Sequence, residues 1–512
     1  MRPLLASLLF FGTAAERAVV FVRHPEGAAD RLLHELSLRA DPSSKLYLQW
    51  LSKDEVASIL SPDPAHLAVL DELARRHVAT ATTVVGGDKL VVDFGTAAVP
   101  PSFLEAAVAS GAADGSARSS FRLARPPPVP RRRGSNATTS TDAWPGPQSC
   151  LSSLDGVTPT CLRKAYGLDS HATIGGGGGG GGGGQAFAVD NPFKPADLAQ
   201  FQKEYGLPDQ PVAHVVGQNS GAAGHEASLD AQWLIATGEG VETTFVYLDG
   251  KADNPFTNWL VWAAGAPDAT LPKVHSLSVG APEDAVGDAI IGRMNTEMAA
   301  LGARGVSVVF ASGDSGWQPQ QKFGAASPYV TAVGGIYNGE MRSGALQADA
   351  LTTGGFAASA HNKAGAWQKG AIASYMATHG RRPKKIDPNQ RAVPDVSAYD
   401  DEINVVINGG DTTLSGTSAA CPMVAGMLAS INTALAAAGH NTTLGFANPF
   451  LYANEAAFLD ITRGDNNGIA AVKGYDPISG LGTFGPTTFQ QLKAAAVDAA
   501  AAAARKRQVV EA

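Results

Sequence analysis

The chain has 512 residues, of which 44% are hydrophobic and 17% are charged. This length exceeds what one ordinary core can hold, and the hydrophobic content excludes a largely disordered protein, so we expect two or three folded parts. The formal net charge of −8 is mild and spread along the chain, which gives no reason to expect nucleic acid binding or a strongly acidic partner.

Residues 1–15 have the layout of a signal peptide. Arg2 precedes an apolar run from Leu4 to Phe11, and small residues end the segment at Ala15. The run is too short to span a bilayer, and no later segment looks apolar for long enough to form a transmembrane helix. We therefore expect export to a lumen or to the outside of the cell, without stable membrane insertion. A frayed N-terminal helix is the alternative interpretation.

Three cysteines and two glycosylation sequons are consistent with an exported protein. Cys150 and Cys161 lie close together in the sequence, and a small disulfide loop between them is feasible in an oxidising compartment. Cys421 would then be unpaired. The sequons at Asn136 and Asn441 fit a glycosylated product, although such tripeptides are common by chance.

Residues 16–110 are predicted to form a small α/β domain with a ferredoxin-like order of elements. From Ala18 onward the pattern indicates a strand, then helices, then a hairpin whose turn contains Gly86 and Gly87 between two apolar runs. This first domain carries no evident catalytic cluster.

Residues 111–149 turn to arginine, proline, serine and threonine and are predicted to be a linker. Its run of three arginines from Arg131 to Arg133 could be a processing site or simply a solvated charge run. Ten consecutive glycines at 175–184 predict a loop, and they do not indicate a nucleotide site because no clear strand precedes them and no helix follows. The alanine-rich residues 496–512 are expected to be a helical or frayed tail.

Residues 150–495 are predicted to form the large domain. Short β-branched runs alternate with helical ones from Val212 onward, which predicts a doubly wound, mostly parallel sheet covered by helices on both faces. In such sheets the functional groups gather at the carboxyl ends of the strands.

The segment LSGTSAACPMVAG contains the strongest local signal for catalysis. Gly416 and Thr417 precede Ser418, and an apolar helix begins at once, so Ser418 is expected at a helix N-terminus that favours developing negative charge. Pro422 is expected in the first turn, where no N–H partner is needed. The alternative is that Ser418 is an ordinary N-cap residue.

A serine nucleophile needs a base, and the segment GHEASLDAQWL offers two carboxylates. The His-Gly-Thr-His type of segment that subtilisin-like enzymes use does not occur, and His225-Glu226 is no zinc motif because Leu229 stands where a histidine is required. Glu226 and Asp230 are four residues apart and so share one face of a predicted helix. Their repulsion predicts one shared proton over part of the acid range. Most such pairs, however, are solvated helix surface.

A third carboxyl group follows the buried-type strand in VSVVFASGDSGW. Asp314 lies at the strand tip, beside the expected active-site edge, where a protonated carboxyl could donate to an oxyanion. Ser315 in GDSG resembles a chymotrypsin nucleophile, but the following Gly-Pro and a matching histidine segment are missing, so that interpretation is rejected.

Taken together, EASLD, FASGDSG and SGTSA resemble the signature of the sedolisin family of serine-carboxyl peptidases. The similarity extends to VVGQ, MNTEM, ASPYVTAVGG and LGFANPFLY, which are most like the tripeptidyl-peptidases of that family. The resemblance implies a subtilisin-like fold preceded by an activation prodomain. It also implies that Ser418 is the nucleophile, that Glu226 is the base with Asp230 as its support, and that Asp314 serves the oxyanion.

The same resemblance implies one structural Ca²⁺ near the C-terminus, in FLDITRG and VKGYDPISGLGT. Asp460 and Asp476 would supply carboxylates, and the backbone carbonyls of Ile461, Val472 and Gly474 would complete an oxygen shell with water. Without the resemblance, these aspartates would be read as ordinary turn residues.

The resulting hypothesis is an acid peptidase of a secreted or lysosomal and vacuolar compartment that acts on peptides or unfolded proteins. It is expected to release tripeptides from free N-termini and to be made as a proenzyme. Its first domain would cover the cleft and leave by cleavage between the linker and about Gly156 on acidification. Three alternatives remain open: an endopeptidase of the same family, a catalytically silent binding protein on the same fold, and a subtilisin-type protease with a distant histidine.

Departures from the family pattern put subsite shape in doubt. His225 stands where an apolar residue is usual, Gly324 stands where proline is usual, and Thr353 replaces one glycine of a triplet. Cys421 could be a reactive thiol, but a buried cysteine on a helix face is the expectation.

Overall fold

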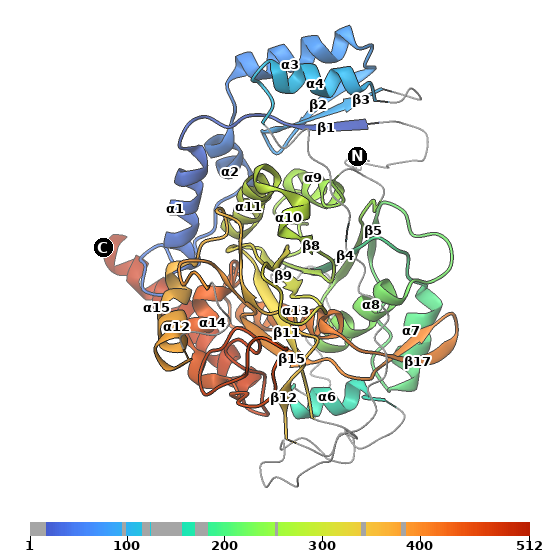
Figure 1. Ribbon diagram of the computed structural model, residues 1–512, viewed down its shortest axis with the longest axis vertical. Coiled ribbons are helices and arrows are strands. Elements are labelled where there is room, and N and C mark those ends of the chain that lie inside the picture. The colour runs from blue at the N-terminus through green and yellow to red at the C-terminus, as the bar shows by residue number, and fades with distance from the viewer. Residues whose placement is uncertain are drawn as a thin grey trace.

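The computed structural model describes residues 17–94, 99–114, 123, 156–168, 183–250, 254–338, 345–379 and 386–511. The expected signal peptide, most of the expected linker, nearly all of the glycine tract, and the residues Asn136 and Cys150 lie outside these described residues. Figure 1 shows a small N-terminal region that lies against one side of a larger domain.

The N-terminal region has the predicted small α/β architecture. Its elements are β1 (Arg17–Phe21), α1 (Ala28–Ala40), α2 (Lys53–Leu60), α3 (Pro64–Arg76), β2 (Ala81–Val85), β3 (Lys89–Asp93) and α4 (Pro101–Ala109). The strands form an antiparallel sheet in the order β1-β3-β2, and α3 and α4 pack on it. Gly86 and Gly87 have φ values of 62° and 87°, so the predicted tight hairpin turn is confirmed. An isolated bridge between Val22 and Ala113 stands where a ferredoxin-like sheet has its fourth strand.

The large domain is built on the predicted parallel sheet. Its strands are β4 (Gln185–Val189), β5 (His214–Val216), β6 (Thr243–Tyr247), β7 (Val274–Leu277), β9 (Ser307–Ala311), β11 (Thr331–Tyr337), β12 (Gln347–Ala348) and β15 (Val396–Tyr399). The order is β5-β6-β4-β7-β9-β11-β12, with β15 also paired to β11. Every pairing in this sheet is parallel except that of β11 with β12.

Helices cover both faces of this sheet, which confirms the doubly wound prediction. The helices are α6 (Pro159–Ala165), α7 (Pro195–Glu204), α8 (His225–Thr237), α9 (Thr257–Gly265), α10 (Glu283–Val286), α11 (Asp288–Ala303), α12 (Ala366–His379), α13 (Thr417–Ala437), α14 (Asn448–Ala453) and α15 (Thr488–Glu511). Phe187 and Phe245 pack in the core formed with α8 and α13, whereas the next residues, Ala188 and Val246, pack in the core formed with α9 and α11. Successive residues of a strand point to opposite faces, so this alternation defines two helix layers.

Helix α13 is the central core helix, and it corrects one expectation about Pro422. Because α13 begins at Thr417, Pro422 lies in the second turn rather than the first and interrupts the helical hydrogen bonds. The backbone carbonyl of Ser418, which an N–H at position 422 would otherwise reach, instead lies 3.4 Å from the hydroxyl of Ser278. We expected no segment after the signal peptide to be apolar for long enough to cross a membrane, but α13 is one such helix among the described residues; 78% of its apolar stretch is buried inside the protein. It therefore matches the core helix of a folded domain.

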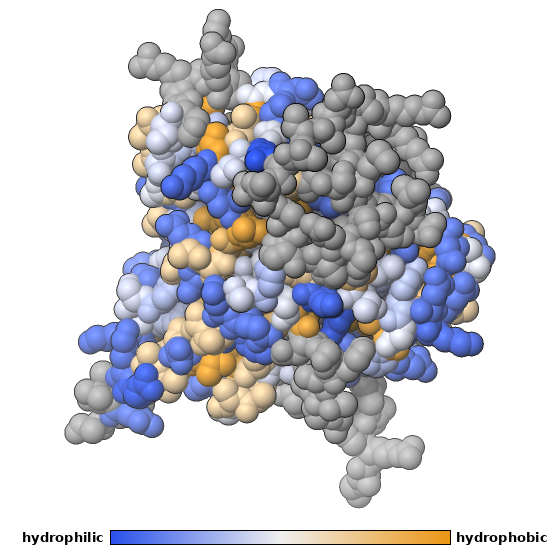
Figure 2. Space-filling view, turned by 90° about the horizontal axis from the view of Figure 1, so that it is seen from below, coloured by the Kyte–Doolittle hydropathy of each residue, from blue (hydrophilic) through white to orange (hydrophobic). Residues whose placement is uncertain are grey.

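The alanine-rich C-terminal segment is part of a packed helix. Helix α15 runs to Glu511 and packs against α13, and Ala496, Ala500 and Ala503 are buried. On the face of the molecule shown in Figure 2, hydrophobic areas are small and hydrophilic residues lie between them.

The N-terminal region docks mainly on α9 and α11 of the large domain. Leu36 of α1 packs with Ala303 of α11, and the indole N–H of Trp50 donates to the Thr443 carbonyl at 2.8 Å. In Figure 1, α1 and α2 run down the side of the large domain beside α11. Further contacts reach the segment before α14, where the hydroxyl of Thr442 donates to the Leu48 carbonyl at 2.8 Å.

A buried ion pair ties the sheet to its surroundings. Arg391 and Asp395 are fully buried and paired, and Asp395 also accepts hydrogen bonds from the Ala332 amide at 2.8 Å and the Tyr452 hydroxyl at 2.9 Å. Since Ala332 belongs to β11, this carboxylate connects the sheet to α14. Removing it would leave a buried guanidinium without its counter-charge.

We predict that Asp395→Ala lowers the free energy of unfolding by about 3–5 kcal/mol, because breaking a buried pair leaves an uncompensated charge. Urea or thermal unfolding of the full chain measures the loss. Arg75→Ala, which removes exposed pairs on α3, is the control and should cost less than about 1 kcal/mol. Equal effects of the two substitutions would contradict this account.

Candidate active site

Ser418 lies at the N-terminus of α13, as predicted. The residue before the helix, Gly416, has φ 129°, and Ser418 is 6% exposed. Its hydroxyl donates to the backbone carbonyl of Ser278 at 3.4 Å. The N-cap position of α13 is held by Gly416, so the alternative interpretation of Ser418 as an ordinary N-cap residue is wrong.

Glu226 and Asp230 lie on one face of α8 and are not solvated surface. Asp230 is fully buried, and the Oε1 atom of Glu226 is buried without a hydrogen-bond partner among the described residues. Burial raises the pKa of Asp230 to about 8. Burial and the neighbouring charge of Asp230 raise the pKa of Glu226 well above its ordinary value, and the nearby Ser418 hydroxyl partly offsets this rise. The two carboxyls therefore hold protons far more readily than exposed acids do.

Ser278 links this carboxyl pair to the serine. It directly follows β7, and its hydroxyl donates to Oδ1 of Asp230 at 2.7 Å while its carbonyl accepts from Ser418. The motifs did not single out Ser278. Its position at the carboxyl end of a parallel strand is the one sequence signal that could have identified it.

Asp314 lies three residues beyond β9 and contacts Thr417, the residue before the serine. Its Oδ1 atom accepts hydrogen bonds from the amide and hydroxyl of Thr417 at 2.8 and 2.7 Å. Burial raises the pKa of Asp314, although the Thr417 bonds lower it in part. A Cβ atom at Gly416 would lie 2.7 Å from Oδ2 of Asp314, so this glycine gives the carboxyl its space. A protonated Oδ2 would be a hydrogen-bond donor beside the nucleophile.

Other candidate groups do not compete with this set. Cys421 is fully buried against β7 and β9, and burial raises the pKa of its thiol to about 12, so it is a structural core residue. Cys161 is disulfide-bonded, as expected, while its expected partner lies outside the described residues. Within the described part of the chain, no histidine is hydrogen-bonded to Ser418. His225 is exposed at the start of α8.

A second pair of acids, Asp349 and Asp400, lies behind the loop that precedes Ser418 and was missed by the sequence analysis. Burial and the charge of Asp349 raise the pKa of Asp400 well above its ordinary range, and burial raises that of Asp349 to about 6. The carbonyl of Asp400 accepts the Gly416 amide at 2.8 Å. Nothing in the local sequence distinguishes these aspartates from surface acids.

Backbone hydrogen bonds connect the loops that contain Asp460 and Asp476. The amide of Gly474 donates to Asp460 at 2.9 Å, and the amide of Val472 donates to Asp476 at 2.8 Å. Asp476 is fully buried, and burial raises its pKa to about 7. No ion pair compensates this buried carboxylate among the described residues, so the oxygen-rich loop fits a hard cation.

The sequence of this chain is similar to those of known serine peptidases. A model described as the subtilase family matches residues 219–445, a range that includes Glu226, Asp230, Asp314 and Ser418. Tripeptidyl-peptidase 1 of Homo sapiens is 35% identical over 359 residues, which cover 64% of this chain and 62% of the human protein. The Mus musculus protein of the same name is 33% identical over 390 residues, which cover 70% of this chain and 66% of the mouse protein. The chain thus matches less than two thirds of the length of these relatives.

Among solved structures, the fold is similar to that of Pseudomonas sedolisin, a serine-carboxyl proteinase in complex with pseudo-iodotyrostatin. The TM-score is 0.52 at 20% sequence identity, over 67% of this chain and 98% of that chain. This likeness confirms the subtilisin-like fold expected from the sequence. These comparisons indicate a serine-type peptidase that is similar to tripeptidyl-peptidase 1 and has the fold of sedolisin.

Proposed function

We propose that this protein is an acid serine-carboxyl peptidase that hydrolyses peptide bonds through an acyl-enzyme. One observation carries the proposal: three acids with a raised pKa gather around Ser418, namely Glu226, whose pKa the Ser418 hydroxyl influences, Asp230, and Asp314, which binds the neighbouring Thr417. A catalytically silent binding protein would have no need to bury three acids around a serine, since each buried charge costs free energy.

The geometry supports a two-step reaction. Glu226 takes the proton from Ser418 Oγ as this atom attacks the peptide carbonyl, and Asp230, held by Ser278, keeps the second proton of the pair. Protonated Asp314 donates to the oxyanion, and the helix N-terminus favours the same negative charge. The C–N bond then breaks, the proton on Glu226 passes to the leaving amine, and water hydrolyses the acyl-enzyme by the reverse transfers.

We further propose that the enzyme releases tripeptides from free N-termini. The similarity to tripeptidyl-peptidase 1 supports this assignment. The negative charge of Asp190, which follows β4, acts on Glu226 and would attract a protonated amino terminus to this side of the site. Cleavage within chains, as an endopeptidase performs it, is the second candidate, and the lengths of the products decide between the two.

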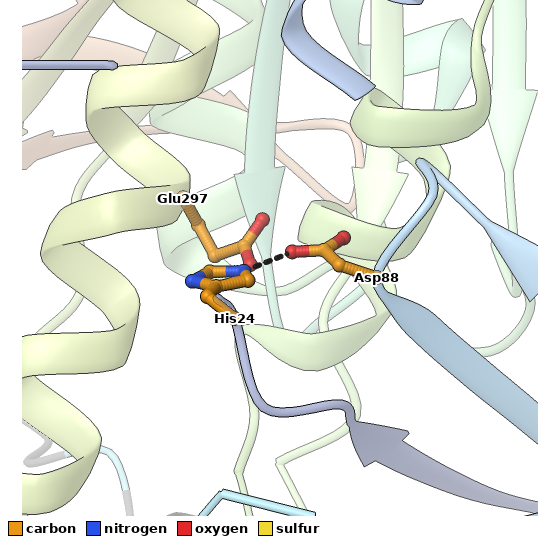
Figure 3. Close-up of side chains that lie close together, drawn as sticks. All are labelled: His24, Asp88 and Glu297. Carbon is orange, nitrogen blue, oxygen red and sulfur yellow. Dashed lines mark hydrogen bonds and ion pairs between the residues drawn. The ribbon is translucent and has the colours of Figure 1, made fainter. Parts of the chain in front are cut away.

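We also propose that the N-terminal region is an activation domain that is released in acid by cleavage between the linker and about Gly156. A buried ionic network holds this region on the large domain, and Figure 3 shows three of its acidic and histidine side chains. Asp88 contacts Lys89 at 2.7 Å, His24 at 2.6 Å and Arg293 of α11 at 2.5 Å, while Glu297 of α11 contacts Lys89 at 2.6 Å. Two domains therefore share one set of opposite charges.

The cluster of His24, Asp88 and Glu297 in Figure 3 has the donor types of a metal site, but its charges are already compensated. Lys89 and Arg293 neutralise the two carboxylates. Burial would raise the pKa of Asp88, but the two cations outweigh it and hold the pKa well below its ordinary value. The network thus favours docking rather than metal binding.

The calcium loop and the compartment complete the proposal. Asp460 and Asp476, with the carbonyls of Ile461, Val472 and Gly474, would hold one structural Ca²⁺, which would neutralise the buried Asp476 carboxylate. The disulfide at Cys161 supports an oxidising compartment, in line with a secreted or lysosomal and vacuolar location.

We predict that Ser418→Ala and Glu226→Gln each lower kcat by about 10⁴-fold or more, because the nucleophile and its base act as a unit. Hydrolysis of peptides with free N-termini by the acid-activated protein measures the loss, and the product lengths identify the cleavage mode. Ser315→Ala is the matched control, since this exposed serine of GDSG should leave activity near wild type. Activity retained in Ser418→Ala but lost in Ser315→Ala would reverse the assignment.

We predict that activity peaks in acid and falls toward neutrality. Because the pKa of Asp314 is raised, its carboxyl is protonated in acid and loses its proton as pH rises through that pKa, which removes the oxyanion donor. Asp314→Asn cannot ionise, so its reduced activity should persist to higher pH than that of wild type. The pH profiles of kcat for the two proteins give the comparison. Full wild-type activity above neutral pH would refute the proposed role.

We predict that Asp88→Asn shifts activation to higher pH. A lowered pKa means that Asp88 stabilises docking above the ordinary aspartate pKa of about 4, and that this stabilisation is lost as pH falls toward the lowered value. Conversion of full-length to mature chain across a pH series gives the midpoint. Asp71→Asn, in an exposed pair on α3, is the control. An unchanged midpoint in Asp88→Asn would remove the network from the activation step.

A further inference from the structure

The side chain of Lys322 passes beside two glycines, Gly280 and Gly313, close to Asp314. It lies in β10 (Lys322–Phe323), which pairs with β8 (Ala281–Pro282). A Cβ atom at Gly313 would lie 2.7 Å from Cδ and 2.9 Å from Cε of Lys322, and one at Gly280 would lie 3.5 Å from its Cβ. Since Gly313 directly precedes Asp314, the stem of Lys322 passes beside the residue that faces the oxyanion.

The ammonium of Lys322 has no fixed partner. Across the described ranges, no hydrogen bond or ion pair of its side chain is present, and the residue is partly buried. The nearby acid Glu283 is occupied elsewhere, because its carboxylate accepts the amides of Gln321 at 3.0 Å and Ala358 at 2.8 Å. Asp314 is the acid whose charge acts on Lys322.

Acid removes even this counter-charge. Burial lowers the pKa of Lys322, and the Asp314 carboxylate partly offsets the effect. In acid, however, Asp314 is protonated because its own pKa is raised, so Lys322 is left as a partly desolvated cation without this counter-charge. A group of this kind is stabilised by any carboxylate that binds beside it.

A peptide carbonyl that Ser418 attacks and Asp314 stabilises must lie close to both groups, and the stem of Lys322 passes beside Gly313, the residue that precedes Asp314. We propose that Lys322 is a specificity-determining residue that selects an acidic side chain, aspartate or glutamate, on the substrate residue whose carbonyl is attacked. This inference rests on the proposed peptidase function and names the substrate class of the same site.

Two peptides that differ only by glutamate or glutamine at that residue test the proposal. Glutamine is almost isosteric with glutamate but uncharged, so the ratio of their kcat/KM values isolates the charge. The acid-activated wild type should prefer the glutamate peptide by about tenfold, the size expected for one charge-assisted hydrogen bond. Lys322→Met should reduce the ratio to about one, and Lys322→Arg should restore most of it. The wild-type ratio should also grow from pH 3 to pH 5, as glutamate ionises near its ordinary pKa of about 4.3.

Two controls separate this inference from the function on which it depends. Lys369→Met removes an exposed lysine of α12 and should keep the wild-type ratio. Cleavage of the glutamine peptide that is lost in Ser418→Ala establishes the peptidase function by itself. If wild type cleaves both peptides equally, or if Lys322→Met keeps the glutamate preference, the role of Lys322 is refuted while the peptidase function stands. Loss of both cleavages in a folded Lys322→Met would also refute a specificity role.

Discussion

Burial of two carboxyls on one helix face is the constraint on which the active site depends. Glu226 and Asp230 are brought out of water by the packing of α8 against α13, the helix that also carries Ser418. Two neighbouring carboxyls that are shielded from water cannot both ionise without a large cost in free energy. The pair therefore retains a proton at pH values at which exposed acids are ionised. The same packing therefore brings the pair to the nucleophile, and in the proposed reaction the pair holds a single proton, so that one carboxylate is free to act as base.

The surrounding fold converts this helix pair into a site. Parallel strands end at one edge of the sheet, which delivers Ser278 after β7 and Asp314 after β9 to the N-terminus of α13. Ser278 contacts both sides of the set through its hydroxyl and its carbonyl. Small residues are needed where these groups meet, as Gly416 beside Asp314 and Gly313 beside Lys322 illustrate. Position in the sheet thus accounts for the site more fully than any single motif does.

Charge is used in two further ways in this molecule. Between the domains, Asp88 and Arg293 form a compensated network, in which acid and base are both buried and paired. At the active site, Lys322 lacks such compensation, and we infer that a substrate supplies it. The contrast is physical: a paired buried charge holds two parts of a protein together, whereas an unpaired charge beside a reactive group favours binding of an opposite charge.

The sequence predicted the order of elements well because hydrophobic periodicity reports directly on strands and helices. Glu226, Asp230, Asp314 and Ser418 were identifiable because they lie in compact motifs at predicted element ends. The burial of the pair Glu226 and Asp230 could not be predicted. Two acids four residues apart are typical of an exposed helix surface, and only the structure shows that α13 packs against this helix.

Other features depend on contacts between distant segments. Lys322 and Gly313 meet only through tertiary packing, as do Asp88 and Arg293 across the domain interface. Pro422 was placed one turn too early because the helix start at Thr417 is set by the Asp314 contacts. Local sequence carries no record of such pairings, so they required the structure.

The most direct test of the central claim is to trap the nucleophile with a serine-reactive fluorophosphonate in acid and to map the modified residue by mass spectrometry. The account predicts labelling at Ser418 in the acid-activated protein and strongly slowed labelling in Glu226→Gln, because the base that activates the hydroxyl is removed. Labelling at another residue, or an unchanged rate in Glu226→Gln, would contradict a serine activated by the buried carboxyl pair.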